Sequence, residues 1–367
     1  MALTPQQRLN AALAKLSPAI RKAIEESMAK AATAIDANAL ADAIDRRDVE
    51  AVFLMTKIKP EQLFTVGEIV RFGYLTSGQG IDERLPLAIR ATFGFGGNPR
   101  AVQQAQTIVG HMITNVLADQ RQAITVATQE LMTRVVNTGI PAKAAALEIV
   151  GKINRATGLR EGGYLGLDVP RTEQAERVAA MLRDPKLLAG YWQIDPVTGD
   201  KKWVGGYFIK GPKGEMKPRY TTTDRRFDAT VRKAIADGKA VSEADAIKIT
   251  AMHRARLLKN RADTISRTEG LNALRAGEHD GFQLLVDSGA VADSRVIREW
   301  IPTGDSRTRE DHREMAGKKI IGMSEPFLLP DGSKMMFPGD SSMGAAAKEI
   351  IACRCAQSFR LKRPSEA

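Results

Sequence analysis

Apolar residues recur at intervals of three, four or seven along much of this chain, and this spacing restricts the fold more than any other feature. A helix brings such positions onto one face, so amphipathic helices are expected to supply most of the structure. Aromatic residues make up only 5% of the sequence, which predicts an aliphatic core. With 367 residues the chain is long enough for two or three domains, each with a core of its own.

Residues 1–98 are predicted to form an N-terminal helical region. Thr4 suits an N-cap and Pro5 a first helical position, and the pattern up to Lys59 predicts two or three short helices. The run from Phe93 to Pro99 is rich in glycine, which predicts a hinge or tight connection after this region. No Gly-Lys-Ser/Thr follows these glycines, so they are not expected to cradle a phosphate.

Residues 99–158 are predicted to form a long-helix middle. An apolar stripe from Val102 to Val135 predicts one helix to about Val136, the longest element, with a length of about 50 Å. The start of the stripe has nearly the spacing of a coiled coil. The helix is therefore expected either to pack within its own domain or to contact further copies of the chain in a homo-oligomer. Gly139 ends it, and the next helix is expected to close near Gly158.

Residues 171–240 are predicted to contain a helix and an inserted β-hairpin segment. A glycine-rich linker from Gly158 to Pro170 marks the expected boundary before them. The runs Tyr191–Ile194 and Lys202–Val204 flank a turn sequence, and a second hairpin is expected to turn at Lys210–Gly214.

Positive charge is concentrated around these hairpins. Between Thr198 and Arg275 there are 18 Lys and Arg against nine Asp and Glu, in a chain whose formal net charge is +11. Such a segment favours a polyanion such as packaged double-stranded DNA, because neutralised phosphates release counterions. The alternative is a solvated helix face beside basic turns. The candidate DNA-binding residues are Lys201, Lys202, Lys210, Lys213, Lys217, Arg219, Arg225 and Arg226.

Residues 241–367 are predicted to form a small α+β C-terminal domain. Ser242 caps a long helix that is expected to reach about Ala276, and the apolar stripe of this helix places Glu269 on the buried side. A buried carboxylate is costly unless it is paired, so Arg307 and Arg309 are the expected partners of Glu269. The whole chain is thus expected to be mainly α, with long N-terminal helices, this α+β domain and the inserted hairpins.

The two cysteines of the sequence, Cys353 and Cys355, are separated by one residue, which disfavours a disulfide between them and fits a reducing cytoplasm. They are expected to begin a final strand that ends near Leu361. Together with His312, and with Asp305 as a further candidate, they offer ligands for zinc. The alternative is a small buried core in which His312 makes a hydrogen bond.

Several segments of the C-terminal half carry a resemblance to a known family. They are Arg225–Asp228, Arg261–Glu269, Trp300, Asp305–Arg309 with His312, and Cys353–Cys355. In order and spacing they resemble the phage Mu F-like minor head proteins of the phage head morphogenesis family, over roughly Ile140 to Arg360. Ala352 stands where that family often has Asn. The motif residues are Arg267, Thr268, Glu269, Trp300, Asp305, Arg307, Arg309, His312, Cys353 and Cys355.

The resemblance implies a minor capsid protein of a tailed bacteriophage. Such a structural protein would belong to the virion, in the capsid interior or at the portal vertex, and would be found in the host cytoplasm during assembly. Its expected partners are the portal protein and the major capsid or scaffold protein. Its expected role is in head morphogenesis: capsid assembly, DNA packaging or DNA ejection. The alternative is a DNA-binding internal virion protein that is ejected with the genome.

No catalysis is expected, and no cofactor apart from the zinc considered above. His312 with Cys353, or with Glu269, could be taken as a base with a nucleophile or an acid, but neither pair has independent support in the sequence. No stretch approaches the roughly 18 uninterrupted apolar residues of a membrane-spanning helix. No secretory signal is visible at the N-terminus, so a soluble chain with no membrane partner is expected.

Overall fold

The computed structural model describes residues 3–81, 85 and 94–362. Most of these residues are helical and the strands form small sheets, which confirms the mainly α prediction. The chain divides into two compact units, each assembled from separate stretches of sequence. Unit 1 comprises Met1–Ile24, Leu63–Val116 and Ala262–Ala367, and unit 2 comprises Glu25–Gln62 and Leu117–Arg261. The division into four consecutive domains stays a prediction.

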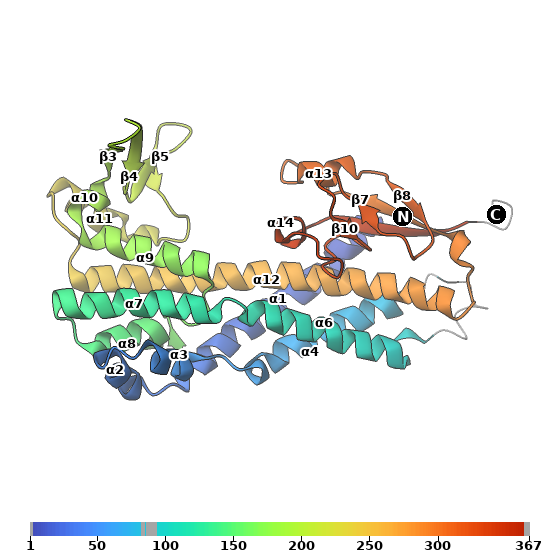
Figure 1. Ribbon diagram of the computed structural model, residues 1–367, viewed down its shortest axis with the longest axis horizontal. Helices are drawn as coiled ribbons and strands as arrows, with labels where there is room; N and C mark the ends of the chain where they lie inside the picture. The colour runs from blue at the N-terminus through green and yellow to red at the C-terminus, as the bar shows by residue number, and fades with distance from the viewer. Residues whose placement is uncertain (1–2, 82–84, 86–93, 363–367) are drawn as a thin grey trace. The chain divides into compact units, whose positions relative to one another are not determined.

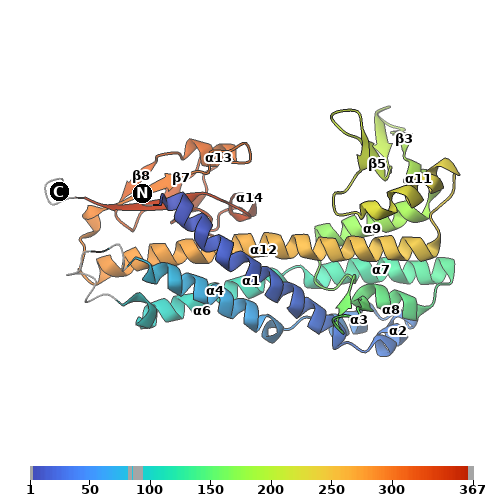
Figure 2. The same ribbon diagram turned by 180° about the vertical axis from the view of Figure 1, so that it is seen from behind.

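Unit 1 is built on four helices that pack through small residues. A Cβ added to Gly270 of α12 would lie 3.2 Å from the Leu13 side chain of α1, and Leu16 of α1 lies over Gly73 of α4. Figure 2 shows this part of α1 alongside α4 and α12. Helices α1 and α12 also have residues in unit 2. The four helices are α1 (Pro5–Thr33), α4 (Phe64–Gln79), α6 (Pro99–Leu117) and α12 (Glu243–Asp287).

Helix α12 continues past its predicted end at Ala276. Glycine often follows the last residue of a helix, and Gly277 comes next. In the structure Gly277 lies inside α12 against α4, where an added Cβ would be 2.1 Å from the carbonyl oxygen of Tyr74. This glycine therefore allows close helix packing and does not end the helix. With 45 residues, α12 is the longest of the described helices.

The single long helix predicted along the stripe from Val102 to about Val136 is two helices, so that prediction is wrong. Helix α6 ends at Leu117, and α7 covers Gln120–Thr138. The polar side chains at Asp119 and Gln120 interrupt the apolar stripe at this break. Helix α7 ends as expected, because Gly139 adopts a left-handed φ of 65°. A homo-oligomer contact along this stripe stays a prediction.

The N-terminal region forms three helices before Lys59, in agreement with the two or three predicted, but the first is longer than expected. Helix α1 is a 29-residue helix that continues through Pro18, rather than a short one. Two short helices follow, α2 (Ala37–Asp45) and α3 (Val49–Thr56), each begun by an aspartate whose carboxylate accepts backbone N–H bonds.

The glycine-rich connection predicted at Phe93–Pro99 is present where the structure describes it. Phe93 itself lies outside the described residues. Phe95 is fully buried, with its ring centroid 5.5 Å from that of Tyr74 on α4. The described part is therefore a packed connection rather than a free hinge.

Unit 2 contains α2, α3 and five further helices. Helix α8 ends at Val150, before the predicted Gly158, because Gly151 has a φ of 85° and the chain enters a small antiparallel pair, β1 (Lys152–Ile153) and β2 (Arg160–Glu161). The predicted glycine-rich linker is packed against unit 2, with Tyr164, Leu165 and Leu167 buried. The five helices are α7, α8 (Ala142–Val150), α9 (Val169–Arg183), α10 (Pro185–Ala189) and α11 (Asp228–Ala236).

Both predicted β-hairpins are present in unit 2, beside α10 and α11 (Figure 1). Strand β3 (Tyr191–Ile194) pairs with β4 (Lys201–Val204), and β5 (Phe208–Lys210) pairs with β6 (Met216–Pro218). The base of the hairpins is anchored by a buried cluster that includes Val178, Leu182, Leu188, Tyr207, Phe208 and Ile249.

A buried ion network crosses the core of unit 2. Glu148 lies 2.8 Å from Arg134 and 3.1 Å from Arg254, and the Arg254 guanidinium stacks over Tyr164. Burial opposes ionisation of Glu148, but the two arginines outweigh it and lower the pKa of this carboxyl. The charges therefore stay paired inside the unit.

The C-terminal part of unit 1 is a small α+β layer, as predicted. Its three-stranded antiparallel sheet has the order β11 (Ala356–Leu361), β7 (Val296–Ile301), β8 (Lys319–Ile321). Alternate residues of the central strand β7, among them Arg298 and Trp300, point inward and are buried. Arg298 remains satisfied because its guanidinium donates to three backbone carbonyls. The other elements are α13 (Glu310–Glu314), β9 (Phe327–Leu328), β10 (Lys334–Met335) and α14 (Ala347–Ile350).

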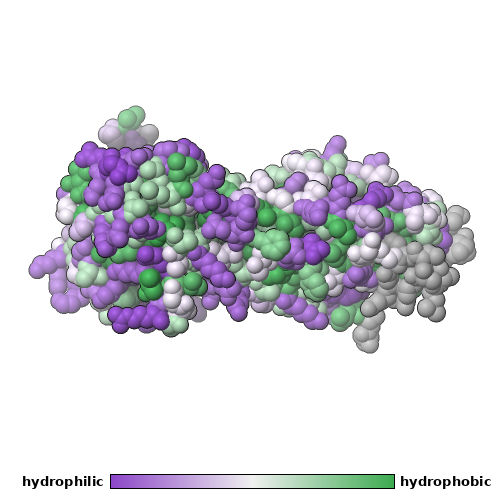
Figure 3. Space-filling view, turned by 90° about the horizontal axis from the view of Figure 1, so that it is seen from below, coloured by the Kyte–Doolittle hydropathy of each residue, from purple (hydrophilic) through white to green (hydrophobic). Residues whose placement is uncertain are grey.

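The surface of the described residues carries hydrophobic as well as hydrophilic side chains. Figure 3 shows hydrophobic and hydrophilic residues interspersed over one face. Among the helices that the structure describes, none combines the length and the hydropathy needed to span a membrane.

Candidate functional site

Residues 351–355, the CRC loop, connect α14 to β11. The cysteines precede the final strand and do not begin it, because β11 starts at Ala356. Ala352 has a φ of 53°, a left-handed conformation that costs alanine about 1 kcal/mol. The side chains of Cys353 and Cys355 lie in the interior, each with an exposed fraction of 2%. The loop is therefore a tight turn that presents two thiols to the core.

Two motif segments bind the CRC loop directly. Thr268 Oγ1 on α12 accepts a 3.0 Å hydrogen bond from the backbone N–H of Ala352. Asp305 accepts two 2.6 Å bonds from the guanidinium of Arg354, and this fork holds the pKa of Asp305 well below its usual range. Asp305, considered above as a zinc ligand, is thus occupied by Arg354 and is not part of the group formed by the thiols and His312.

His312, on α13, lies next to both thiols. Its Nδ1 is 3.3 Å from Sγ of Cys355 and 3.6 Å from Sγ of Cys353. Trp300 packs edge-on against the imidazole, with ring centroids 5.4 Å apart. The side chains of Trp300 and His312 are both buried. The structure thus brings together the three residues named as zinc ligands from the sequence.

Two buried charged residues beside the thiols were missed by the sequence analysis. Glu349 Oε2 lies 2.8 Å from His312 Nε2, although the two atoms are not aligned for a good hydrogen bond. Arg275 of α12 donates from Nη2 to the carbonyl oxygen of Cys353 at 2.8 Å. Arg275 follows Thr268 by seven residues, two helical turns, so this spacing could have revealed it. Helix α14, which holds Glu349, has only four residues and offers no such periodicity.

The two thiols favour a single ionisation between them. A hydrogen bond from Cys355 and the positive charge of Arg275 lower the pKa of Cys353 against the effect of burial. The same hydrogen bond and burial raise the pKa of Cys355. One thiolate beside one thiol is the state that this environment favours.

Glu269 does not make the expected ion pair with Arg307 or Arg309. Arg309 donates to a backbone carbonyl of the CRC loop at 2.6 Å, and Arg307 lies 3.8 Å from Asp305. Thr268, one residue earlier and about 100° round the helix, contacts the loop instead. Glu269 is partly buried, and none of the described residues forms a hydrogen bond or ion pair with it. Burial raises the pKa of its carboxyl to about 7.

Residues 225–358 match the family described as Phage Mu protein F like protein. This part of the chain is Mu F-like. The Mu F-like region contains all the motif residues discussed above, and it implies a virion-associated phage head morphogenesis protein. No curated protein and no solved structure matches the chain.

A groove in unit 1 lies beside the CRC loop and is lined by arginines, four of them from the Mu F-like region. Its volume is about 740 Å³, and Asp263 is the one carboxylate among the residues that line it. Arg267 is exposed and makes no hydrogen bond or ion pair with any described residue, so its charge is available to a partner. The lining arginines of this arginine groove are Arg21, Arg267, Arg307, Arg309 and Arg354.

The eight candidate DNA-binding residues divide into two groups. Arg219 donates to the backbone carbonyls of two glycines. Arg226 pairs with Asp224 at 2.7 Å, and Arg225 lies 3.9 Å from a carboxylate. These arginines serve the local fold. The hairpin lysines precede the Mu F-like region and are exposed, and their ammonium groups contact no described carboxylate: Lys201, Lys202, Lys210, Lys213 and Lys217.

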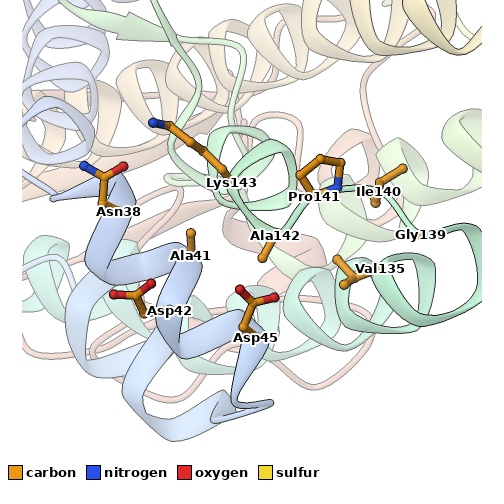
Figure 4. Close-up of a pocket in the computed structure, with 10 residues that line it drawn as sticks. All are labelled: Asn38, Ala41, Asp42, Asp45, Val135, Gly139, Ile140, Pro141, Ala142 and Lys143. Atoms are coloured by element: carbon orange, nitrogen blue, oxygen red, sulfur yellow. The ribbon is translucent and has the colours of Figure 1, made fainter.

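A second hollow, of about 560 Å³, lies in unit 2 between α2 and the connection from α7 to α8. Figure 4 shows Asp42 and Asp45 on α2 across this hollow from Ala142. Neither carboxylate belongs to a group of described residues that could hold a metal ion, and no cysteine or histidine lines the hollow. Its lining residues therefore do not point to a metal site or a catalytic site.

Proposed function

We propose that this chain is a minor head protein of a tailed phage that binds the portal or the inner capsid surface and acts in head assembly, DNA packaging or ejection. The match of residues 225–358 to the Mu F-like family is the observation that carries this proposal. The proposed role is one of assembly, so it needs no catalytic chemistry from the chain.

The arginine groove is the proposed docking site for an acidic segment of the portal, capsid or scaffold protein. Arg267 makes no ion pair with any described residue. Arg307 is exposed, and its ion pair with Asp305 is long, at 3.8 Å. The wall of the groove is held in place by the Asp305–Arg354 fork and by the bond from Arg309 to the CRC loop. Such preorganised guanidinium groups favour a carboxylate partner.

The test compares the content of this chain in purified phage heads. Heads assembled with the wild-type chain are expected to retain it in a fixed ratio to the portal protein. The double variant Arg267→Glu/Arg307→Glu is expected to be depleted by about tenfold or more, because a reversed charge repels the acidic partner. Arg313→Glu, on the exposed side of α13, is the matched control and should be retained.

Two outcomes of this experiment would count against the proposal. Equal retention of the charge-reversed variant would remove the arginine groove as the docking site. Absence of the wild-type chain from purified heads would remove the proposed function itself.

A second candidate function is that of an internal virion protein that binds the genome and is ejected with it. The five exposed hairpin lysines favour it, because no described carboxylate neutralises them. Binding of duplex DNA should then weaken steeply with salt. Replacing the five lysines with Gln should reduce the slope of log affinity against log salt by about one for each phosphate that the chain then leaves unneutralised.

The matched control for DNA binding replaces five exposed lysines elsewhere and should leave the salt dependence unchanged. A flat salt response of the wild-type chain, or equal slopes for both variants, would reject the hairpins as a DNA interface. The control lysines are Lys15, Lys143, Lys152, Lys318 and Lys334.

A further inference from the structure

We propose that His312, Cys353 and Cys355 bind a zinc ion that fastens the CRC loop to α13. The three side chains come from two segments that lie about forty residues apart in the sequence, and all three are buried. Two thiolates and an imidazole are the donor types that zinc prefers. This inference concerns the stability of the Mu F-like region and does not depend on the proposed docking site.

The spacing of the three donor atoms fits one tetrahedral ion. Zinc lies about 2.3 Å from a thiolate sulfur and about 2.0–2.1 Å from a histidine nitrogen, which places sulfur and nitrogen about 3.6 Å apart on one ion. His312 Nδ1 lies 3.3 Å from Sγ of Cys355 and 3.6 Å from Sγ of Cys353. All three donor atoms lie within 4.8 Å of one another. Small side-chain shifts therefore suffice to seat the ion.

The alternative, a buried core in which His312 makes only hydrogen bonds, explains the positions of the two thiols less well than a bound zinc ion does. The Nδ1 atom of His312 carries either one proton or one lone pair, so it forms one good hydrogen bond. Two sulfur atoms nevertheless approach it, from Cys353 and from Cys355. A buried thiol packs as a small apolar group, and both cysteines belong to a buried apolar cluster, but this packing alone does not direct both sulfur atoms to one nitrogen. A shared ion accounts for the convergence of all three.

Glu349 occupies the place of the outer partner that a zinc-bound histidine usually has. Its carboxylate lies 2.8 Å from Nε2 of His312, and both side chains are 2% exposed. A carboxylate on that side favours the tautomer with the proton on Nε2, which leaves the Nδ1 lone pair directed to the thiols. Lys348 lies 3.1 Å from the other carboxylate oxygen. Glu349 is thus a positioning residue.

The charges balance when the ion binds. Both sulfurs are thiolates when they bond to zinc, and any proton that they still carry is released to solvent, so the two thiolates cancel the charge of the dication. Arg275 and Glu349, the other buried charges beside the group, have opposite signs. Binding therefore leaves no net buried charge, and a water molecule can complete the tetrahedron.

The first test measures metal in the purified chain without chelator treatment. About one equivalent of zinc is expected, whereas less than about a tenth of an equivalent would overturn the proposal. Cobalt(II) added after chelation should produce the visible absorption of a tetrahedral thiolate site. The wild-type chain gives this readout, so it does not depend on a variant that folds. Lack of the absorption would also overturn the proposal.

The second test assigns the residues. Cys353→Ser and Cys355→Ser should each abolish the cobalt absorption, with circular dichroism as the check that the helices remain. Glu349→Gln should weaken zinc binding about 10–100-fold in competition with a coloured chelator. Glu314→Gln, an exposed residue of α13, is the matched control and should bind zinc as the wild type does. Equal affinity of the two Gln variants would remove the role of Glu349.

Discussion

The surroundings of the CRC loop in unit 1 and the β3–β6 hairpins of unit 2 are both rich in basic residues, but these residues make different contacts in the two regions. Around the loop, Arg275, Arg309 and Arg354 each bind a defined oxygen acceptor. On the hairpins, the five lysines extend into solvent and none contacts a described carboxylate. A guanidinium that is held by its acceptors stabilises the local fold, whereas an exposed ammonium without a carboxylate partner remains solvated. Arg275, Arg309 and Arg354 are therefore tied into the fold around the CRC loop, whereas the five hairpin lysines are not tied into the fold by such contacts.

Tryptophans show the same contrast. Trp300 on β7 is fully buried against His312 and Phe327. Trp192 on β3 has an exposed fraction of 63% and packs edge-on against Trp203. The fully buried tryptophan of this pair therefore lies beside the CRC loop, and the exposed one lies on the hairpins. The stability of the molecule is expected to follow this difference.

The largest expected effect comes from Trp300→Ala. It should lower the free energy of unfolding by about 3–5 kcal/mol, because it leaves a cavity between the sheet and α13. Trp192→Ala is the matched change in the hairpins and should cost less than about 1 kcal/mol. Urea unfolding of both variants measures the two values. Similar losses would contradict the contrast between the regions.

Glu269→Gln should raise stability at neutral and higher pH. The folded-state pKa of about 7 lies above the ordinary value of 4.5, so burial penalises the ionised carboxylate. This penalty is absent below about pH 4.5, grows as the pH rises through 7 and is complete above it. The variant should gain about 1–3 kcal/mol near pH 8 and almost nothing near pH 4.5. A loss of stability near pH 8 would contradict this account and would support the ion pair between Glu269 and an arginine that the sequence predicted.

Ala352→Asn should stabilise the CRC loop by about 0.5–1 kcal/mol. Asparagine adopts the left-handed conformation that Ala352 has at φ 53° at a lower energetic cost than alanine does. Ala347→Asn, in helix α14, is the matched control and should give no gain, because a helical position favours alanine. Thermal unfolding of the two variants distinguishes them. A lower stability of Ala352→Asn would show that the backbone at Ala352 is not strained.

The smallest effect on stability is expected from the five hairpin lysines. Their replacement with Gln breaks no described contact, so the urea midpoint should stay where it is in the wild type. The same variant is the one whose DNA binding should change if the hairpins contact the genome. A clear loss of stability would mean that the lysines support the fold and would remove the contrast with the CRC loop.

Local signals in the sequence predicted much of the fold. The turn sequences placed both hairpins, Gly139 ended α7, and Ser242 begins α12, where its Oγ accepts the backbone N–H of Asp245. Each of these features depends on a few consecutive residues, whose conformational preferences act locally. They can therefore be recognised without knowledge of the tertiary structure.

The errors occurred where distant packing decides the outcome. Gly277 has the local signature of a helix end, but the backbone of α4 packs against it. The apolar stripe marked one side of α12, and it could not show that Thr268 rather than Glu269 faces the CRC loop. The three candidate zinc ligands could be named from the sequence because their chemistry is visible there, and their side chains lie together in the structure. Glu349 was missed because its role depends only on proximity to His312.

The motif segments of the Mu F-like region converge to hold the CRC loop. A double-mutant cycle of Asp305→Ala and Arg354→Ala in equilibrium unfolding tests this convergence most directly, because these two residues form a fork between two motif segments. The convergence predicts that the double variant loses less stability than the sum of the single losses. Strictly additive losses would contradict it.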